Sequence, residues 1–146
     1  MIYIDTSALV KTILDEAESP AFREYLVDKD AVFTSALTRI EFPRAIARGA
    51  PSRMTVALRR IQTLNYIGLS ADILRSAAAV QPVTLRTLDA IHLASALSIR
   101  SELEALVAYD DRLLAAAASL GIEATALEER LIRRLKAPSM PPQATE

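Results

Sequence analysis

The sequence predicts one α/β domain, built as a doubly wound, mainly parallel sheet of about five strands flanked by helices. Short apolar runs alternate along the chain with longer segments whose apolar residues recur every three or four positions. This alternation is typical of a parallel sheet covered by helices on both faces. The predicted strands are apolar at successive positions, as strands buried on both faces are. A chain of 146 residues, 51% of them apolar, has the length of one domain and enough apolar side chains for a substantial core.

Each predicted strand is followed by at least one predicted helix. The strands are expected at residues 1–4, 31–34, 64–69, 105–109 and 122–126. The helices are expected at residues 7–17, 19–29, 36–49, 52–61, 73–80, 87–99, 113–120 and 128–136. Pro43 lies inside the third helix, where it removes a backbone hydrogen bond and should bend the axis. The domain is expected to cover residues 1–136, and the proline-rich residues 137–146 are expected to form a disordered tail.

The composition narrows the classes of site that the chain can hold. It has no cysteine, which excludes disulfide scaffolds, thiolate zinc sites and cysteine nucleophiles. Because there is also a single histidine, any metal ion would be held mainly by oxygen. No basic and apolar leader opens the chain, and no uncharged run approaches the roughly 20 residues of a membrane helix. We therefore expect a cytoplasmic protein with no membrane partner.

The charges are unevenly distributed, although the formal net charge is only −1. No acid occurs between Glu41 and Asp72, and this stretch is rich in arginine. The arginines are Arg44, Arg48, Arg53, Arg59 and Arg60. The stretch could follow the phosphates of a nucleic acid. Alternatively, it could form a solvated helix face that pairs with the acids of residues 15–30.

Four carboxylates stand at positions where the surrounding sequence is apolar. They are Asp5 and Asp110 at the ends of two strands, Glu41 between Ile40 and Phe42, and Asp89 near the start of the most apolar helix. An unpaired buried carboxylate costs several kcal/mol, so each of them needs a donor, a cation or a metal ion. Taken singly, each has a structural explanation. Asp5 and Asp110 could cap helices, Asp89 could favour its helix dipole, and Glu41 could pair with Arg44 or Arg48.

Taken together, the four acids point to a metal site. Asp5 and Asp110 lie at the carboxyl edge of the predicted sheet, where α/β proteins bind ligands, and the helices of Glu41 and Asp89 could reach the same edge. Crowded carboxylates repel one another unless a cation lies among them. Ligand sets made only of oxygen favour Mg²⁺ or Mn²⁺. Such an ion beside a basic surface indicates phosphodiester hydrolysis by a metal-activated water.

Four segments of the chain resemble the motifs of a known family. They are residues 2–9 (IYIDTSAL), 39–41 (RIE), 88–94 (LDAIHLA) and 107–113 (VAYDDRL). In order, spacing and predicted context they resemble the successive motifs of PIN-domain ribonucleases, and more narrowly those of the VapC toxins of bacterial type II toxin–antitoxin pairs. The resemblance extends from residue 1 to about residue 126.

This resemblance implies a PIN-like fold and a metal-dependent endoribonuclease toxin. The acidic quartet that binds Mg²⁺ or Mn²⁺ would be Asp5, Glu41, Asp89 and Asp110. It would position a water that cleaves RNA and leaves a 5′ phosphate and a 3′ hydroxyl. Ser7 would lie beside Asp5 and hydrogen-bond into the site. The resemblance also implies a homodimer and a cognate VapB-like antitoxin whose C-terminal segment blocks the active-site groove.

Two positions depart from the family pattern. Ala108 stands where the family often has threonine or serine, so a hydroxyl that could support the metal ligands is missing. Pro43 is unusual two residues after Glu41 and could shift that carboxylate. Asp111 is a supporting residue that could replace Asp110 or act as an outer ligand.

The remaining polar residues near the motifs have less specific roles. His92, the only histidine, is expected to hydrogen-bond inside the core rather than to act as a base. Arg112, just after the last acids, is expected to contact phosphate, whereas Arg86 is expected to be a solvated charge. Arg44 and Arg48 could bind RNA or an acidic antitoxin.

Two other classes of function stay open at this point. The first is a PIN-like module that binds RNA or protein but cuts weakly or not at all; Ala108 and Pro43 favour it, and the complete quartet opposes it. The second is a phosphotransfer or nucleotide-binding domain. It lacks support because the glycines are too scattered for a phosphate-binding loop, and no lysine follows the last strands as in a receiver domain.

Overall fold

The centre of the molecule is the short strand β1 (Ile2–Ile4), which lies in the middle of a five-stranded sheet. The computed structural model describes residues 1–17 and 19–126, so the predicted helix 128–136 and tail 137–146 lie outside the described residues. The other strands are β2 (Val32–Ser35), β3 (Asn65–Ile67), β4 (Ala105–Val107) and β5 (Ala124–Thr125). Their order is β3-β2-β1-β4-β5, and every neighbouring pair is parallel. The predicted fold class is confirmed.

The order of the strands creates a crevice beside β1. The chain first builds the sheet from β1 through β2 to β3, and then returns to the other side of β1 to add β4 and β5. Ile4 of β1 pairs with Val107 of β4, so the two strands end at the same level. The crevice outside the carboxyl ends at such a reversal is where open α/β sheets bind ligands. Asp5 and Asp110 follow these two strands.

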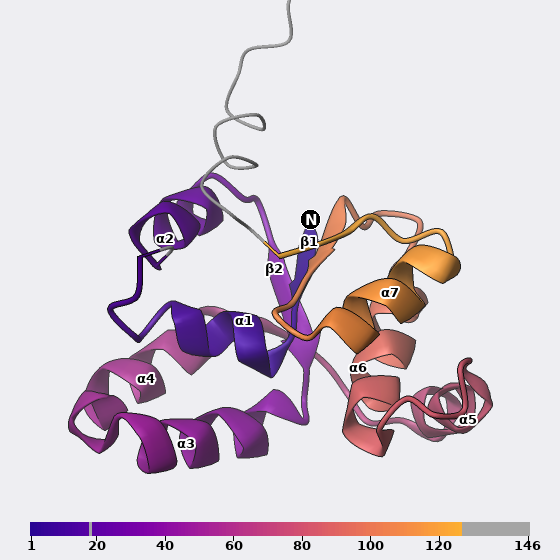
Figure 1. The fold of residues 1–146 in the computed structure, drawn as a ribbon, viewed down its shortest axis with the longest axis horizontal. Coiled ribbons are helices and arrows are strands. Elements are labelled where there is room, and N and C mark those ends of the chain that lie inside the picture. Colours follow the sequence, from indigo (N-terminus) through magenta and orange to yellow (C-terminus); the bar gives the residue numbers. More distant parts are fainter. Residues whose placement is uncertain (18, 127–146) are drawn as a thin grey trace, which may run out of the picture.

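Seven helices of the described chain cover the two faces of the sheet (Figure 1). They are α1 (Thr6–Lys11), α2 (Ser19–Val27), α3 (Thr38–Gly49), α4 (Met54–Arg60), α5 (Ala71–Ala79), α6 (Thr87–Ser98) and α7 (Asp111–Ser119). Figure 1 shows α1 to α4 on one side of the sheet and α5 to α7 on the other. The α3 helix continues through Pro43 without interruption.

The alternation of side chains along β1 divides the core between these two faces. Ile2 and Ile4 belong to the apolar cluster on the α1–α4 side, whereas Tyr3 belongs to the cluster on the α6–α7 side. The largest partners in the first cluster are Leu9, Phe22, Phe42 and Ile46, and those in the second are Leu93, Leu106 and Leu113. All three residues of β1 are fully buried, as its continuous apolar sequence predicts.

The first helix is shorter than the sequence predicts. A helix over residues 7–17 is expected, but α1 ends at Lys11. Both the backbone N–H and the hydroxyl of Thr12 donate to the carbonyl of Leu9, at 3.0 and 2.7 Å. Such local hydrogen bonds satisfy the last carbonyls of a helix and compete with its continuation. Ile13 therefore packs into the core from a turn and not from a helix.

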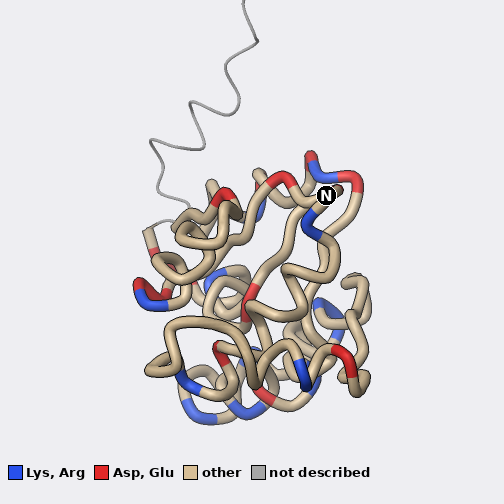
Figure 2. Tube along the Cα trace, turned by 90° about the vertical axis from the view of Figure 1, so that its right-hand side faces the viewer, with Lys and Arg blue, Asp and Glu red and all other residues tan. Residues whose placement is uncertain are grey.

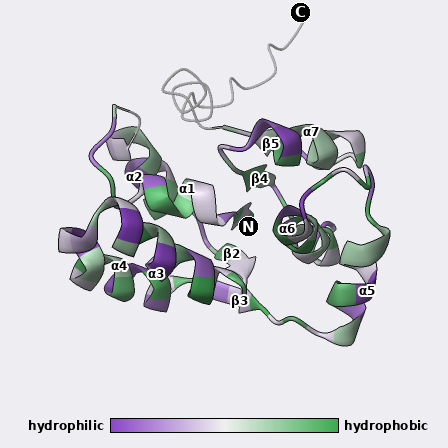
Figure 3. Ribbon diagram, turned by 60° about the horizontal axis from the view of Figure 1, so that its bottom comes forward, coloured by the Kyte–Doolittle hydropathy of each residue, from purple (hydrophilic) through white to green (hydrophobic). Residues whose placement is uncertain are grey.

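The α6 helix carries Asp89 at the edge of the core. Its residues Ala90, His92, Leu93, Ala94, Ser95 and Ala96 are buried, and Figure 3 shows it between the sheet and α5. Despite this apolar character, neither α6 nor any other helix in the described part of the chain combines the length and apolarity that crossing a bilayer requires. The burial fixes α6 against the sheet and thereby fixes the position of Asp89 in its first turn.

Truncation of the core should cost far more stability than truncation of a surface leucine. Leu106 of β4 is fully buried, whereas Leu58 of α4 is 44% exposed. We expect Leu106→Ala to lower the free energy of unfolding by about 3 kcal/mol, because it removes buried methyl groups and leaves a cavity. Leu58→Ala should lower it by less than about 1 kcal/mol. Urea denaturation measures both changes. Equal losses of unfolding free energy would contradict a core that is packed on both faces of the sheet.

Candidate active site

Asp5 lies at the end of β1 and begins α1. Its side chain is only 5% exposed. Its Oδ1 accepts a hydrogen bond from the backbone N–H of Ala8 at 2.8 Å, and the hydroxyl of Ser7 donates to Oδ1 and Oδ2 at 2.7 and 2.8 Å. Burial raises the pKa of Asp5 above its ordinary value, and these hydrogen bonds offset part of that rise. Asp5 therefore caps α1, which is the structural role that the sequence also allows.

Ser7 connects the ends of the two central strands. While its hydroxyl donates to Asp5, its Oγ accepts a hydrogen bond from the backbone N–H of Tyr109 at 2.8 Å. Tyr109 directly precedes Asp110. One serine thus holds the segment after β4 against the segment after β1, and it keeps the two strand-end acids in the same crevice.

Asp110 caps α7 in the same way that Asp5 caps α1. Its Oδ1 accepts from the backbone N–H groups of Arg112 and Leu113 at 2.9 and 3.1 Å. Its Oδ2 accepts from Nη2 of Arg86 at 3.2 Å. Asp111 is instead exposed as the first residue of α7. Of the two neighbouring acids, the structure therefore places Asp110 at the crevice.

Glu41 reaches the crevice from α3 and is held by two other elements. The hydroxyl of Thr6 donates to its Oε2 at 2.6 Å, and Nε2 of His92 lies 2.7 Å from the same oxygen. Burial by itself would raise the pKa of Glu41, but the hydrogen bonds from His92 and Thr6 bring it below its ordinary value. Glu41 thus pairs with His92 and not with Arg44 or Arg48.

His92 is buried and is oriented by a tyrosine. The Tyr3 hydroxyl lies 2.7 Å from Nδ1 of His92. Because the Glu41 carboxylate can only accept, Nε2 of His92 carries the proton that it donates; in the neutral imidazole, Nδ1 then accepts from Tyr3. Burial keeps the pKa of Tyr3 well above its ordinary value, so its hydroxyl remains a donor. This geometry agrees with a histidine that hydrogen-bonds inside the core.

Asp89 is the least satisfied of the four acids. Its Oδ2 is buried and accepts no hydrogen bond; the nearest cationic atom is Nε of Arg86, 3.5 Å away. Burial raises the pKa of Asp89, and the negative charge of Asp110 raises it further. A buried carboxylate oxygen without a donor is unusual in a folded protein and indicates a place for a cation.

The structure brings the four acids to one edge of the sheet, but their carboxylate oxygens do not surround a common position. The negative charges of Asp110 and Glu41 both raise the pKa of Asp89. Within residues 1–17 and 19–126, however, no three Asp, Glu or His side chains are arranged as ligands of one metal ion. Donors of the protein occupy oxygens of Asp5, Glu41 and Asp110. The oxygen-only ligand set and the orphaned oxygen of Asp89 still fit a hard divalent ion.

The arginines fall into two groups. Arg86, whose side chain is 65% exposed, bridges Asp89 and Asp110 and is therefore more than the solvated charge that the sequence predicts. Arg112 starts α7 beside it, also exposed. Arg44 and Arg48 are exposed on α3, and Figure 2 shows Lys and Arg positions gathered along the helices at the bottom of the molecule.

One arginine of the basic stretch between Glu41 and Asp72 contacts an acid of residues 15–30. Arg53 forms an ion pair with Asp15, and Arg23 lies 3.8 Å from the same carboxylate. This contact supports the pairing of the two stretches for one arginine of the basic group. It does not involve Arg44 or Arg48.

Three contributors to the site are not identified as such from the sequence. Thr6 was only a helix-start residue, although a hydroxyl directly after a strand-end acid is a usable signal. Tyr3 appears as one more apolar position of β1. Arg86 precedes Asp89 by three positions at a helix start, a spacing that favours an ion pair. The packing of α3 and α6 across the sheet decides these contacts, and no local pattern encodes it.

Comparison with known proteins places the fold in a family. The family model of the PIN domain matches residues 2–119. The chain therefore belongs to the PIN-domain family.

Within that family the chain is similar to VapC ribonucleases, as its motifs predict. It is 41% identical to Ribonuclease VapC47 of Mycobacterium tuberculosis, a match that covers 83% of this chain and 93% of the relative. Among solved structures it is similar to a toxin–antitoxin complex from Klebsiella pneumoniae, with a TM-score of 0.65 and 20% identity over 86% of this chain and 97% of that one. It is also similar to VapC20 of M. tuberculosis, with a TM-score of 0.65 and 18% identity over 84% and 96% of the two chains. These findings confirm the resemblance.

The raised pKa of Asp89 predicts a gain in stability when its charge is removed. Because the folded protein disfavours the ionised form, wild type loses stability as the pH rises from the ordinary Asp value of 3.8 through the raised folded pKa. Asp89→Asn should therefore unfold at a higher temperature than wild type at pH 7 in the presence of chelator. This advantage should shrink as the pH falls towards 3.8.

The control for this measurement is Asp111→Asn. Asp111 is exposed in the first turn of α7, where a negative charge favours the helix dipole, so its removal should not raise the melting temperature. A wild-type protein as stable as Asp89→Asn at pH 7 would show that the crevice does not penalise the Asp89 charge.

Proposed function

We propose that this protein is a VapC-type endoribonuclease toxin and that Asp5, Glu41, Asp89 and Asp110 are its catalytic carboxylates. The observation that carries the proposal is the buried Oδ2 of Asp89, which accepts no hydrogen bond although Nε of Arg86 lies 3.5 Å away, among three other acids at the reversal of strand order. The similarity to a VapC ribonuclease over most of the chain supports the choice of RNA as substrate. Such a substrate would be met in the cytoplasm.

The acids would hold Mg²⁺ or Mn²⁺, with Asp5, Asp89 and Asp110 nearest the crevice and Glu41 at its α3 side. Hard oxygen ligands and the lack of cysteine favour these ions. The chemistry that such an ion supplies is activation of water and neutralisation of charge on the phosphoryl group. Ser7 supports this set by fixing both oxygens of Asp5.

The chain's own residues prepare the crevice for a phosphodiester. Arg86, whose guanidinium donates to Asp110, and Arg112, exposed in the first turn of α7, would bind the phosphates that flank the scissile bond. His92 keeps Glu41 ionised and oriented by donating to it from Nε2. Asp111 would act at most as an outer ligand. Arg44 and Arg48, on the exposed face of α3, would extend the basic surface for RNA.

The proposal includes protein partners. One solved structural neighbour is a toxin–antitoxin complex, and we extend that association to a VapB-like antitoxin that neutralises this chain. The toxin itself would be a homodimer.

A module that binds RNA without cutting it is the second candidate. The observation that favours it is the occupation of oxygens on Asp5, Glu41 and Asp110 by protein donors. Under this alternative, removing a carboxylate would leave RNA binding unchanged, and no fragments would form.

Cleavage of RNA by antitoxin-free protein tests the proposal. We expect discrete fragments of total cellular RNA with Mg²⁺ or Mn²⁺ and none with chelator. Asp5→Asn and Asp110→Asn should each lower the rate about a hundredfold or more, because they remove metal ligands. Asparagine remains a good helix cap, so these variants should keep α1 and α7 intact.

The matched control is Asp111→Asn, which changes the neighbouring acid without touching the crevice. It should cleave at nearly the wild-type rate. Loss of activity in Asp111→Asn but not in Asp110→Asn would exchange the roles of the two acids. Intact RNA under all conditions would leave the binding module as the function.

The bridge from Arg86 to two of the acids should compete with the metal ion. The substitution Arg86→Gln removes this bridge and should tighten Mn²⁺ binding about two- to fivefold. The gain is limited to this size because an exposed ion pair contributes at most about 1 kcal/mol. Arg75→Gln removes an exposed arginine that pairs with Asp72 on α5 and serves as the control. Calorimetric titration with Mn²⁺ measures both. Weaker binding by Arg86→Gln would mean that the arginine supports the metal site.

A further inference from the structure

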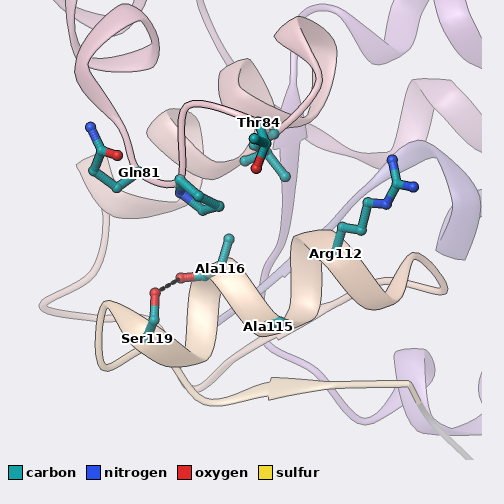
Figure 4. Close-up of a pocket in the computed structure, with 8 residues that line it drawn as sticks. Gln81, Thr84, Arg112, Ala115, Ala116 and Ser119 are labelled. Carbon is teal, nitrogen blue, oxygen red and sulfur yellow. Dashed lines mark hydrogen bonds between the residues drawn. The ribbon is translucent and has the colours of Figure 1, made fainter.

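A cleft of about 800 Å³ opens next to the carboxylates, between α7 and the segment 81–85 that precedes α6. Figure 4 shows the two walls facing each other, with the Ala116 side chain directed into the gap. Arg112 and Thr84 lie towards one end, and Ser119 and Gln81 lie towards the other. The volume falls within the range of about 300–1,000 Å³ that is typical of small-ligand sites.

One end of the cleft lies towards the candidate active site, because Arg112 lines it and the backbone N–H of Arg112 donates to Asp110. Following α7 from Ser119 to Arg112 leads to Asp110, and following the other wall from Gln81 to Thr84 leads to Arg86. These two walls meet where Nη2 of Arg86 donates to Oδ2 of Asp110 at 3.2 Å. An RNA strand with a phosphate at the carboxylates would therefore have a neighbouring nucleotide near this end of the cleft.

The lining of the cleft suits a nucleobase better than a peptide side chain of fixed charge. Its lining is largely apolar, because Pro82 and Leu85 stand on one wall and Ala115 and Ala116 on the other. Small side chains on α7 leave room for a planar ring. No described residue that lines the cleft is acidic, so nothing there repels a phosphate.

The polar groups of the cleft are placed where a nucleotide has polar atoms. Arg112, the one cation of the lining, stands at the end nearest Asp110, where a phosphate would lie. The Gln81 amide and the Thr84 hydroxyl can pair with base edges or with a ribose 2′-hydroxyl. The Ser119 hydroxyl donates to the carbonyl of Ala116 at 2.7 Å, so its oxygen remains an acceptor.

We propose that this cleft is a nucleotide subsite, which binds the base and ribose of the RNA residue next to the scissile phosphate. The inference rests on the proposed ribonuclease function and adds a determinant of which RNA is cut. It assigns α7 a second role beyond presenting Asp110: its alanine face forms the wall against which the base packs.

The test uses the full chain in the presence of chelator, titrated with AMP, GMP, CMP, UMP or inorganic phosphate and followed by NMR. At least one nucleotide should shift the backbone amides of Thr84, Ala115 and Ser119 in a saturable way. Inorganic phosphate should leave Thr84 and Ser119 unshifted. No shift with any nucleotide, or the same shifts with phosphate alone, would overturn the subsite.

Two matched variants introduce the same side chain, one inside the cleft and one outside it. Ala115→Phe places a large ring in the cleft, whereas Ala118→Phe places the same ring at an exposed position of α7 outside the lining. Ala115→Phe should bind the nucleotide about tenfold more weakly, in line with the loss of one packed base. It should also change the nucleotide found beside the cut in total RNA. Ala118→Phe should match wild type in both measurements.

Four outcomes separate the explanations. Equal behaviour of the two variants overturns the subsite. A change in oligomeric mass of Ala115→Phe with unchanged nucleotide binding would make the cleft a protein interface and likewise overturn it. Nucleotide binding in the cleft by a wild-type protein that cuts no RNA would retain the site and reject the ribonuclease; cleavage without nucleotide binding would do the reverse.

Discussion

Carboxylates repel one another, and burial disfavours the ionised form of each, so the crevice beside β1 is the part of this molecule that is hardest to stabilise. The surrounding elements stabilise the carboxylates by supplying hydrogen-bond donors. The starts of α1 and α7 supply backbone N–H groups to Asp5 and Asp110. Thr6 and His92 supply Glu41. Of the four, only Asp89 keeps a buried oxygen without a hydrogen-bond donor, and the exposed Arg86 supplies the nearest positive charge.

The sequence predicts the fold class and the position of the two strand-end acids for the same physical reason. Strands buried on both faces form unbroken apolar runs, so a single acid directly after such a run marks the carboxyl edge of the sheet. The length of α1 was not predictable in this way. The side chain of Thr12 ends the helix, although the apolar residues beyond it continue a helical spacing.

The partners of the acids depend on how distant segments pack, and the sequence alone does not contain that information. Glu41 could have paired with an arginine one turn away on α3, but α6 brings His92 to it from the opposite face of the sheet. Arg86 is largely exposed, yet the turn before α6 aims it at two acids. The cleft along α7 is a similar case, because its alanines also have a plain explanation as strong helix formers.

The hydrogen-bonded series of Tyr3, His92 and Glu41 joins three elements, the central strand β1, α6 and α3. Losing any member would leave a buried polar atom unpaired, at a cost of about 1–3 kcal/mol. Removing one member therefore also disturbs the hydrogen bonds of the other two, so the stability costs of substitutions at the three positions are not additive.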